Sequence, residues 1–133
     1  MYTTKRPVLS STECKAVVQA AEARAATHGW STRRHVAYPT HDLPVSPDVL
    51  GDIADMLTEA VQTRLLPELA QRFELDGTQL SIQDAFVAKY SVAEGGMASL
   101  APHEDGEKKT ARVFLLLVPS LSWQITLFFT LSI

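Results

Sequence analysis

The sequence predicts an α+β fold in which N-terminal helices pack on an antiparallel β-sheet. Three observations carry this prediction. Apolar residues recur every three or four positions in residues 11–27 and 47–73, whereas in residues 80–92 they alternate with polar residues. The dipeptide Asp76-Gly77, which is typical of a turn, separates the two patterns. The change of period therefore divides the chain into a helical part and a sheet part.

A first helix is predicted from about Ser11 to Thr27. Ser10 and Glu13 have the spacing of a capping box, in which two side chains satisfy the free N–H groups of the first turn. The apolar positions that follow at helical spacing are Cys14, Val17, Val18, Ala21 and Ala25. Gly29 predicts the end of the helix, because glycine tolerates the backbone angles of a C-terminal cap.

A second helix is predicted to begin at Pro47, behind the N-cap residue Ser46. Its apolar stripe consists of Leu50, Ile53, Leu57, Val61 and Leu65. Pro67 is predicted to break or kink this helix, because proline lacks a backbone N–H. Between the two helices, residues 31–36 have extended character, and the two prolines of residues 38–44 predict a loop.

Strands are predicted in the remaining chain. Residues 80–92 alternate, with Ile82, Phe86, Ala88 and Tyr90 on one face. Gly95-Gly96 predicts a turn, after which residues 98–103 return in extended form. Residues 111–118 and 121–133 have the unbroken apolar character of buried strands.

The composition fits one domain spanning residues 1–133. Lysine and arginine number 12 against 15 acidic residues, which gives a net charge of −3, and no basic stripe follows a helix. Nucleic acid is therefore not expected as a partner. The first residues lack the apolar core of a signal peptide, and the single cysteine, Cys14, falls on the apolar helix face. Both features favour the cytoplasm.

The tail from Val113 to Ile133 contains no charged residue and is long enough to span a membrane. Pro119, Gln124 and the absence of a charge beyond the segment argue against a membrane anchor. Three alternatives stay open for this tail: buried strands, a segment foreign to the fold, and a tail anchor. The first two are favoured.

His103 and Asp105 lie two residues apart, next to Pro102. On a β-strand such residues point the same way, about 6–7 Å apart, so an imidazole and a carboxylate can converge on one metal ion. Iron(II) accepts this mixed nitrogen and oxygen donor set in the arrangement of two histidines and one carboxylate. The other histidines, His28, His35 and His41, precede the predicted sheet and are expected to be surface or loop residues.

The surroundings of this motif extend the pattern. Residues 86–90, Phe-Val-Ala-Lys-Tyr, followed by residues 95–106 with their proline-histidine-x-aspartate, resemble the motif strands of the iron(II)- and 2-oxoglutarate-dependent dioxygenases. The prolyl and lysyl hydroxylase-like group is the most similar. Residues 29–35 and 38–40 also resemble the region that precedes the helices of such proteins. The resemblance covers most of residues 29–112.

The resemblance implies a double-stranded β-helix, or jelly roll, packed against the helices. It also implies that His103 and Asp105 bind iron and that Tyr90 lines the pocket of the co-substrate. The implied cofactors are iron(II) and 2-oxoglutarate, with ascorbate as a further candidate. The implied activity is that of an oxidoreductase acting on a protein side chain. For Tyr90 the alternative of a core aromatic residue stays open.

Two parts of the family pattern are missing. In the family, a second iron histidine and a basic residue that pairs with 2-oxoglutarate lie on later strands, whereas here no histidine follows Asp105 and no basic residue follows Arg112. A jelly roll needs about eight strands, more than the residues after Leu80 provide. We therefore expect a C-terminally incomplete member that is not catalytically competent alone. A non-catalytic interaction fragment and a tail-anchored membrane protein are the alternatives.

Overall fold

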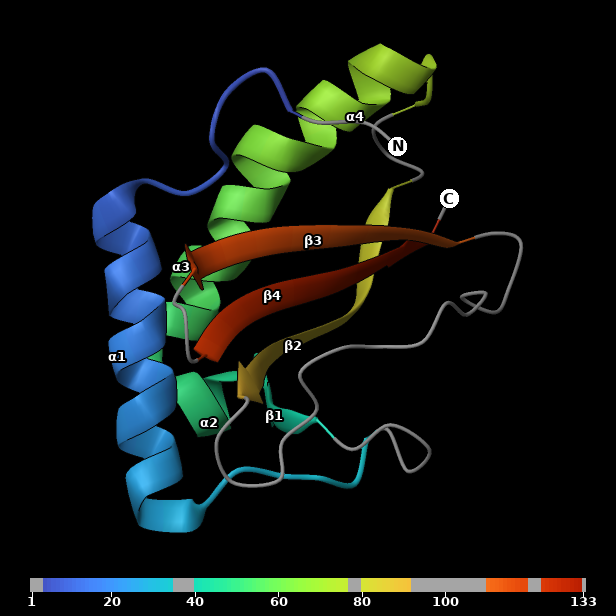
Figure 1. Cartoon of the computed structure of the whole chain (residues 1–133). Coiled ribbons are helices and arrows are strands. Elements are labelled where there is room, and N and C mark those ends of the chain that lie inside the picture. Colours follow the sequence, from blue (N-terminus) through green and yellow to red (C-terminus); the bar gives the residue numbers. More distant parts are fainter. Residues whose placement is uncertain (1–3, 35–39, 77–79, 92–109, 120–122, 133) are drawn as a thin grey trace.

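Helices and strands form two layers, with the helices packed on one face of a four-stranded antiparallel sheet (Figure 1). The computed structural model describes residues 4–34, 40–76, 80–91, 110–119 and 123–132. The predicted α+β class is confirmed at this level.

Helix α1 (Ser11–His28) begins and ends where the sequence predicts. The Ser10 hydroxyl accepts a hydrogen bond from the Glu13 N–H at 3.2 Å, and a Glu13 carboxylate oxygen accepts one from the Ser10 N–H at 2.7 Å. This reciprocal pair satisfies two donors at the start of the helix. Gly29 follows with a φ of 76°, which glycine adopts without a steric penalty.

The second helical region consists of short consecutive helices. They are α2 (Pro47–Leu50), α3 (Asp52–Ala60), the π-helix η1 (Val61–Leu65) and α4 (Leu66–Phe73). The prediction of one helix was wrong at Gly51, where φ is 55° and ψ is −138°. The apolar stripe continues across this glycine, so its periodicity conceals the break.

The π turn explains how the chain accommodates Pro67 within a continuous run of helix. A proline ring in an α-helix meets the carbonyl four residues earlier, here that of Thr63. In η1 the Leu66 N–H donates to the carbonyl of Val61, five residues back, so the turn is wider immediately before the proline. The irregularity predicted at Pro67 is therefore a widened turn rather than a break.

The sheet contains β1 (His41–Pro44), β2 (Ser81–Ser91), β3 (Thr110–Pro119) and β4 (Trp123–Ser132) in the order β1-β2-β4-β3. Strand β4 is antiparallel to both of its neighbours, so β2 and β3 run in the same direction without touching. The strands predicted after Leu80 are confirmed where the structure describes them. The segment predicted at 98–103 lies outside the described residues.

The loop predicted for residues 38–44 is wrong from His41 onward, because these residues form β1. Pro44 is the last residue of this strand and pairs with Phe86 of β2. Proline is tolerated there because the missing N–H falls at the end of a short strand. Ser31 also forms an isolated bridge to Asp42, which confirms the extended backbone expected near residue 31.

The core lies between the helices and one face of the sheet. Strand β4 contributes the fully buried residues Ile125, Leu127, Phe129 and Leu131. The helices contribute Val17, Ala21, Leu57, Val61 and Leu65, among others. Residues 123–132 of the uncharged tail are thus a strand of the sheet, as in the first of the three alternatives. Within the ranges that the structure describes, no helix is long and apolar enough to cross a membrane.

A β-bulge changes the face of Ile82. The pairing of β2 with β4 shifts between Ile82 and Asp84, so Gln83 is an extra residue in β2. The shift turns Ile82 toward the helices, where it packs against the core. The prediction that Ile82 shares a face with Phe86, Ala88 and Tyr90 was therefore wrong, because strict alternation does not allow for the bulge.

We expect Phe129→Ala to lower the free energy of unfolding by about 3–5 kcal/mol, because it removes a ring that is only 1 % exposed from the centre of the core. The matched control is Phe73→Ala, since Phe73 on α4 is 53 % exposed. This control should stay within about 0.5 kcal/mol of the unmodified protein. Urea denaturation measures both changes, and equal losses would contradict the central position of β4.

Glu13 should make the stability depend on pH. The Arg64 guanidinium donates to both carboxylate oxygens of Glu13 at 2.8 and 2.9 Å. These bonds and those with Ser10 lower the Glu13 pKa from 4.5 to about 2. Because the pKa is lower in the folded state, the stabilisation is complete above the unfolded-state pKa and is lost as the pH falls toward 2.

We therefore expect Glu13→Gln to lower the free energy of unfolding by about 1 kcal/mol at pH 7 and to change little near pH 2. Denaturant unfolding at the two pH values measures the difference. Glu74→Gln, at the exposed end of α4, is the control and should show no comparable dependence on pH. An equal effect of Glu13→Gln at both pH values would argue against the ion pair.

Candidate functional site

A group of polar side chains lies on the face of the sheet turned away from the helices. Val87 belongs to the core under the helices, so its neighbours Phe86 and Ala88 point to the opposite face. Register places Asp42 of β1 and Thr126 of β4 on either side of Ala88. The group, which we call the polar cluster, consists of Thr40, Asp42, Ala88, Tyr90 and Thr126.

Burial distinguishes this cluster from an ordinary polar surface. Thr40, Asp42 and Thr126 are 5 %, 2 % and 6 % exposed, and they are the buried polar residues of the described ranges. Ala88 between them is fully buried and carries only a methyl group. Burial of polar groups costs free energy unless they are hydrogen-bonded. Their concentration on one face marks this face as the candidate site.

Asp42 is held in place by its side chain and its backbone. The Thr40 hydroxyl lies 2.8 and 2.9 Å from the two carboxylate oxygens of Asp42 and donates to them. The backbone N–H of Asp42 donates to the Ser31 carbonyl at 2.8 Å, and the Ser31 N–H donates back at 3.0 Å. The carboxylate is therefore fixed in a buried position on the sheet face.

Tyr90 is the predicted site residue that the structure places in this cluster. Its side chain is partly buried at the end of β2. Burial, and secondly the charge of Asp42, raise the pKa of the Tyr90 phenol. The phenol therefore keeps its proton at neutral pH and can donate a hydrogen bond to a carboxylate or carbonyl oxygen.

The other end of the same face is aromatic and basic. The rings of Phe86 and Phe128 stack with centroids 4.8 Å apart. The Arg34 guanidinium lies 4.3 Å from the centre of the Phe86 ring and forms an ion pair with Asp84. The face thus passes from an aromatic end, covered by a guanidinium, to the buried polar cluster.

The predicted iron ligands His103 and Asp105 lie outside the described residues, as does His35. Of the remaining histidines, His28 is exposed and lies within hydrogen-bond distance of Arg24 and Thr27. His41 is stacked with Trp30 at 6.5 Å between ring centroids. Across the described ranges, no three histidine, cysteine or acidic side chains lie close enough together to hold a metal ion.

Lys89 lies on the helix-facing side of β2, opposite to Tyr90. Its ammonium group is 2.8 Å from a Glu22 carboxylate oxygen and 5.6 Å from the centre of the Trp30 ring. The ion pair ties α1 to β2, so Lys89 has a structural role on the helical side of the sheet.

Comparison with known proteins finds no matching family model, no matching curated protein and no matching solved structure. The functional argument therefore depends on the residues of the chain and on the geometry described above.

Sequence reasoning found Tyr90 but missed Thr40 and Asp42. Both residues fall in the segment that its prolines predicted to be a loop. The signal that could have found them is the alternation of Thr40, Asp42 and Pro44 with His41 and Leu43, a period of two that also places one apolar side chain in the core. The segment is too short for this alternation to outweigh two prolines.

We expect Asp42→Asn to lower the pKa of Tyr90, because it removes the negative charge that opposes ionisation of the phenol. Burial of Tyr90 remains, so the pKa should stay above that of a free tyrosine. Ultraviolet titration of phenolate, with Tyr90→Phe in each background to isolate Tyr90, measures the change. Asp48→Asn in α2 removes a charge elsewhere and should leave the titration unaltered.

Proposed function

We propose that the chain carries the first half of a non-haem iron(II)- and 2-oxoglutarate-dependent dioxygenase centre, of the prolyl and lysyl hydroxylase-like kind. The observation that carries this proposal is the position of Tyr90. The tyrosine that the resemblance assigns to the co-substrate pocket belongs to the polar cluster, on the face of the sheet turned away from the helices.

The order of the strands supports a jelly roll as the complete architecture. Among the described strands, β3 follows β2 along the chain, yet β4 lies between them in the sheet. A meander would make consecutive strands neighbours, whereas jelly rolls place strands that are distant in sequence side by side. The pairing of β2 with β4 supports the proposal of a double-stranded β-helix, while the adjacent pair β3–β4 would also occur in a simple antiparallel sheet.

The register shows where the described strands on either side of the metal motif begin and end. Ser91 at the end of β2 pairs with Trp123, and Thr110 at the start of β3 pairs with Ser132. The connection therefore leaves the sheet at one end of β4 and rejoins it at the other. His103 and Asp105 belong to this connection, which begins next to Tyr90.

The donor groups fit the proposed ligands. His103 and Asp105 would hold iron(II) through an imidazole nitrogen and a carboxylate oxygen. When bound, the iron and 2-oxoglutarate supply the oxidising chemistry that protein side chains lack. Tyr90 would orient the co-substrate, because its protonated phenol is a hydrogen-bond donor to a carboxylate or keto oxygen.

The proposed substrate class is a prolyl or lysyl side chain of a protein, with ascorbate as a further cofactor and the cytoplasm as the compartment. Because two iron ligands of the family pattern are present, we expect the chain to bind metal and co-substrate. We do not expect turnover by the chain alone. A non-catalytic interaction fragment remains the alternative, and it differs from the main proposal in predicting no iron binding at the motif.

Anaerobic calorimetric titration of the full chain with iron(II) tests the proposal. We expect saturable binding that His103→Ala and Asp105→Ala each weaken at least about tenfold, because each removes one of two protein ligands. His28→Ala, which changes an exposed histidine of α1, is the matched control and should bind as before. Equal iron binding in all four proteins would refute the assignment of the ligands.

A second titration addresses Tyr90. With iron(II) present, Tyr90→Phe should weaken 2-oxoglutarate binding by about threefold to tenfold, the effect of losing one hydrogen bond. Iron binding itself should stay unaltered. Succinate release measured on the same samples reports whether turnover accompanies binding.

A further inference from the structure

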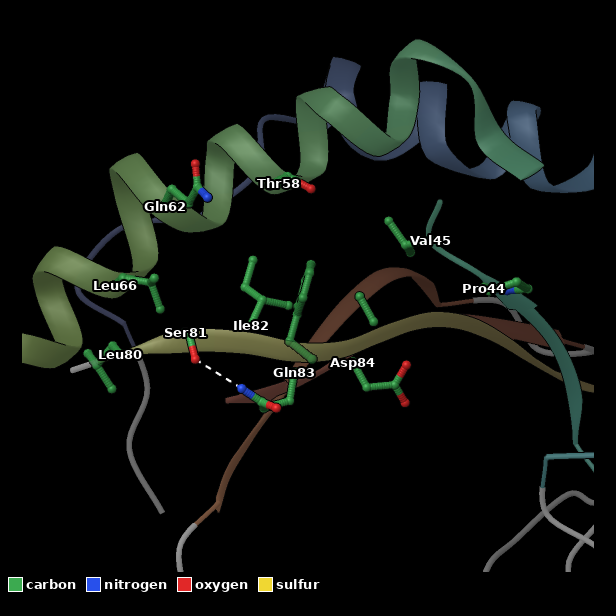
Figure 2. A pocket seen from close by; sticks show the side chains of 12 residues that line it. Pro44, Val45, Thr58, Gln62, Leu66, Leu80, Ser81, Ile82, Gln83 and Asp84 are labelled. Carbon is green, nitrogen blue, oxygen red and sulfur yellow. Dashed lines mark hydrogen bonds between the residues drawn. The ribbon is translucent and has the colours of Figure 1, made fainter. Parts of the chain in front are cut away.

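A cleft of about 760 Å³ lies between the second helical region and the start of β2, remote from Tyr90 at the other end of that strand. Figure 2 shows Thr58, Gln62 and Leu66 above the cleft and the first residues of β2 below it. Pro44 and Val45 lie toward one end of the cleft and Leu80 toward the other. A volume of this size is typical of preformed ligand sites.

The π-helix η1 shapes the helical wall of the cleft. Thr58, Gln62 and Leu66 are spaced four residues apart. On a regular α-helix, each step of four residues rotates the side chain a little further around the helix axis. A π turn contains one residue more than an α turn and rotates the side chain back. It keeps the three side chains in one row along the cleft. π turns of this kind are frequent at functional sites.

The groups that line the cleft are suited to an uncharged ligand. Gln62 is exposed, and its amide has no hydrogen-bond partner among the described residues. The Thr58 hydroxyl donates to the Ala54 carbonyl at 2.9 Å and retains lone pairs that can accept. The single charged residue of the described lining, Asp84, is neutralised by its ion pair with Arg34. The apolar part of the lining consists of Val45, Leu66, Leu80, Ile82, Ala85 and Phe129.

An extended peptide satisfies these requirements. A glutamine amide offers one carbonyl acceptor and N–H donors, so it can pair with the N–H and the carbonyl of a peptide group at once. Strand β1 pairs with β2 from Phe86 to Lys89 and ends at Pro44. The cleft begins next to Pro44 and Val45 and follows residues 80–85, so an extended segment in it would lie along the start of β2.

We propose that this cleft binds an extended, uncharged peptide segment of a partner protein. Gln62 pairs with one peptide group of the segment, and Leu66, Leu80 and Ile82 contact an apolar side chain. This site is independent of the proposed iron centre, because it lies on the helix-facing side of the sheet and uses none of the residues of the polar cluster.

Nuclear magnetic resonance titration of the full ¹⁵N-labelled chain tests the proposal. The probe is a capped alanine pentapeptide with a central leucine. Its matched partner has the peptide N–H after the leucine replaced by an ester oxygen. We expect saturable shifts at the Gln62 side-chain amide and at the backbone amides of residues 81–85, and about threefold to tenfold weaker binding of the ester. A pentapeptide with a central glutamate should not bind.

Gln62→Leu should weaken binding of the amide peptide by a similar factor and remove the difference between amide and ester. Gln19→Leu makes the same change on the exposed surface of α1 and should have no effect. Both positions are exposed on helices, so neither variant should disturb folding, and thermal unfolding confirms this. The absence of saturable shifts, equal binding of amide and ester, or an unaltered Gln62→Leu would each overturn the proposal.

Discussion

The structure depends on the pairing of β4 along both of its edges. Strand β4 hydrogen-bonds to β2 on one side and to β3 on the other, and these two strands do not touch. Its inward residues Ile125, Leu127, Phe129 and Leu131 are at most 1 % exposed beneath the helices. Without this strand the sheet would separate into β1–β2 and an isolated β3, and the helices would lose the surface on which they pack. The uncharged tail of the sequence is thus its structural centre.

The two faces of the sheet have different roles because their side chains differ in kind. The face under the helices is apolar, apart from Lys89, whose charge is compensated by Glu22 and Trp30. The opposite face holds a buried carboxylate, two buried hydroxyl groups and a phenol around a single methyl group. Burial of these polar groups costs free energy unless they are hydrogen-bonded, and the Thr40 hydroxyl supplies such bonds to Asp42. The proposed co-substrate site is assigned to this part of the sheet.

Local signals predicted most of the elements, and features outside local periodicity account for the errors. The capping box at Ser10 and Glu13 fixed the start of α1, since it depends on two side chains close in sequence. The break at Gly51 was hidden because the apolar stripe continues through it. The bulge at Gln83 was hidden because it is determined by the partner strand.

The candidate site shows the same division between local and non-local information. Tyr90 was named through the resemblance of its strand to the dioxygenase motif, whereas Asp42 becomes meaningful only when β1 pairs with β2 and places it beside Ala88. The order β1-β2-β4-β3 is a further property that no single segment encodes. Residues 103 and 105 were identified by their spacing together with the resemblance of the surrounding segments, and their assignment as ligands stays a prediction.

The central position of β4 has a consequence for the order in which the chain can fold. The helices depend on contacts close in sequence, whereas every pairing of β4 with β2 joins residues that are far apart, which slows folding. During synthesis the helices and β2 leave the ribosome before β4, so the backbone groups of β2 that pair with β4 lack their partner for that interval. The nascent protein therefore passes through a stage that is prone to aggregation and suited to protection by a chaperone.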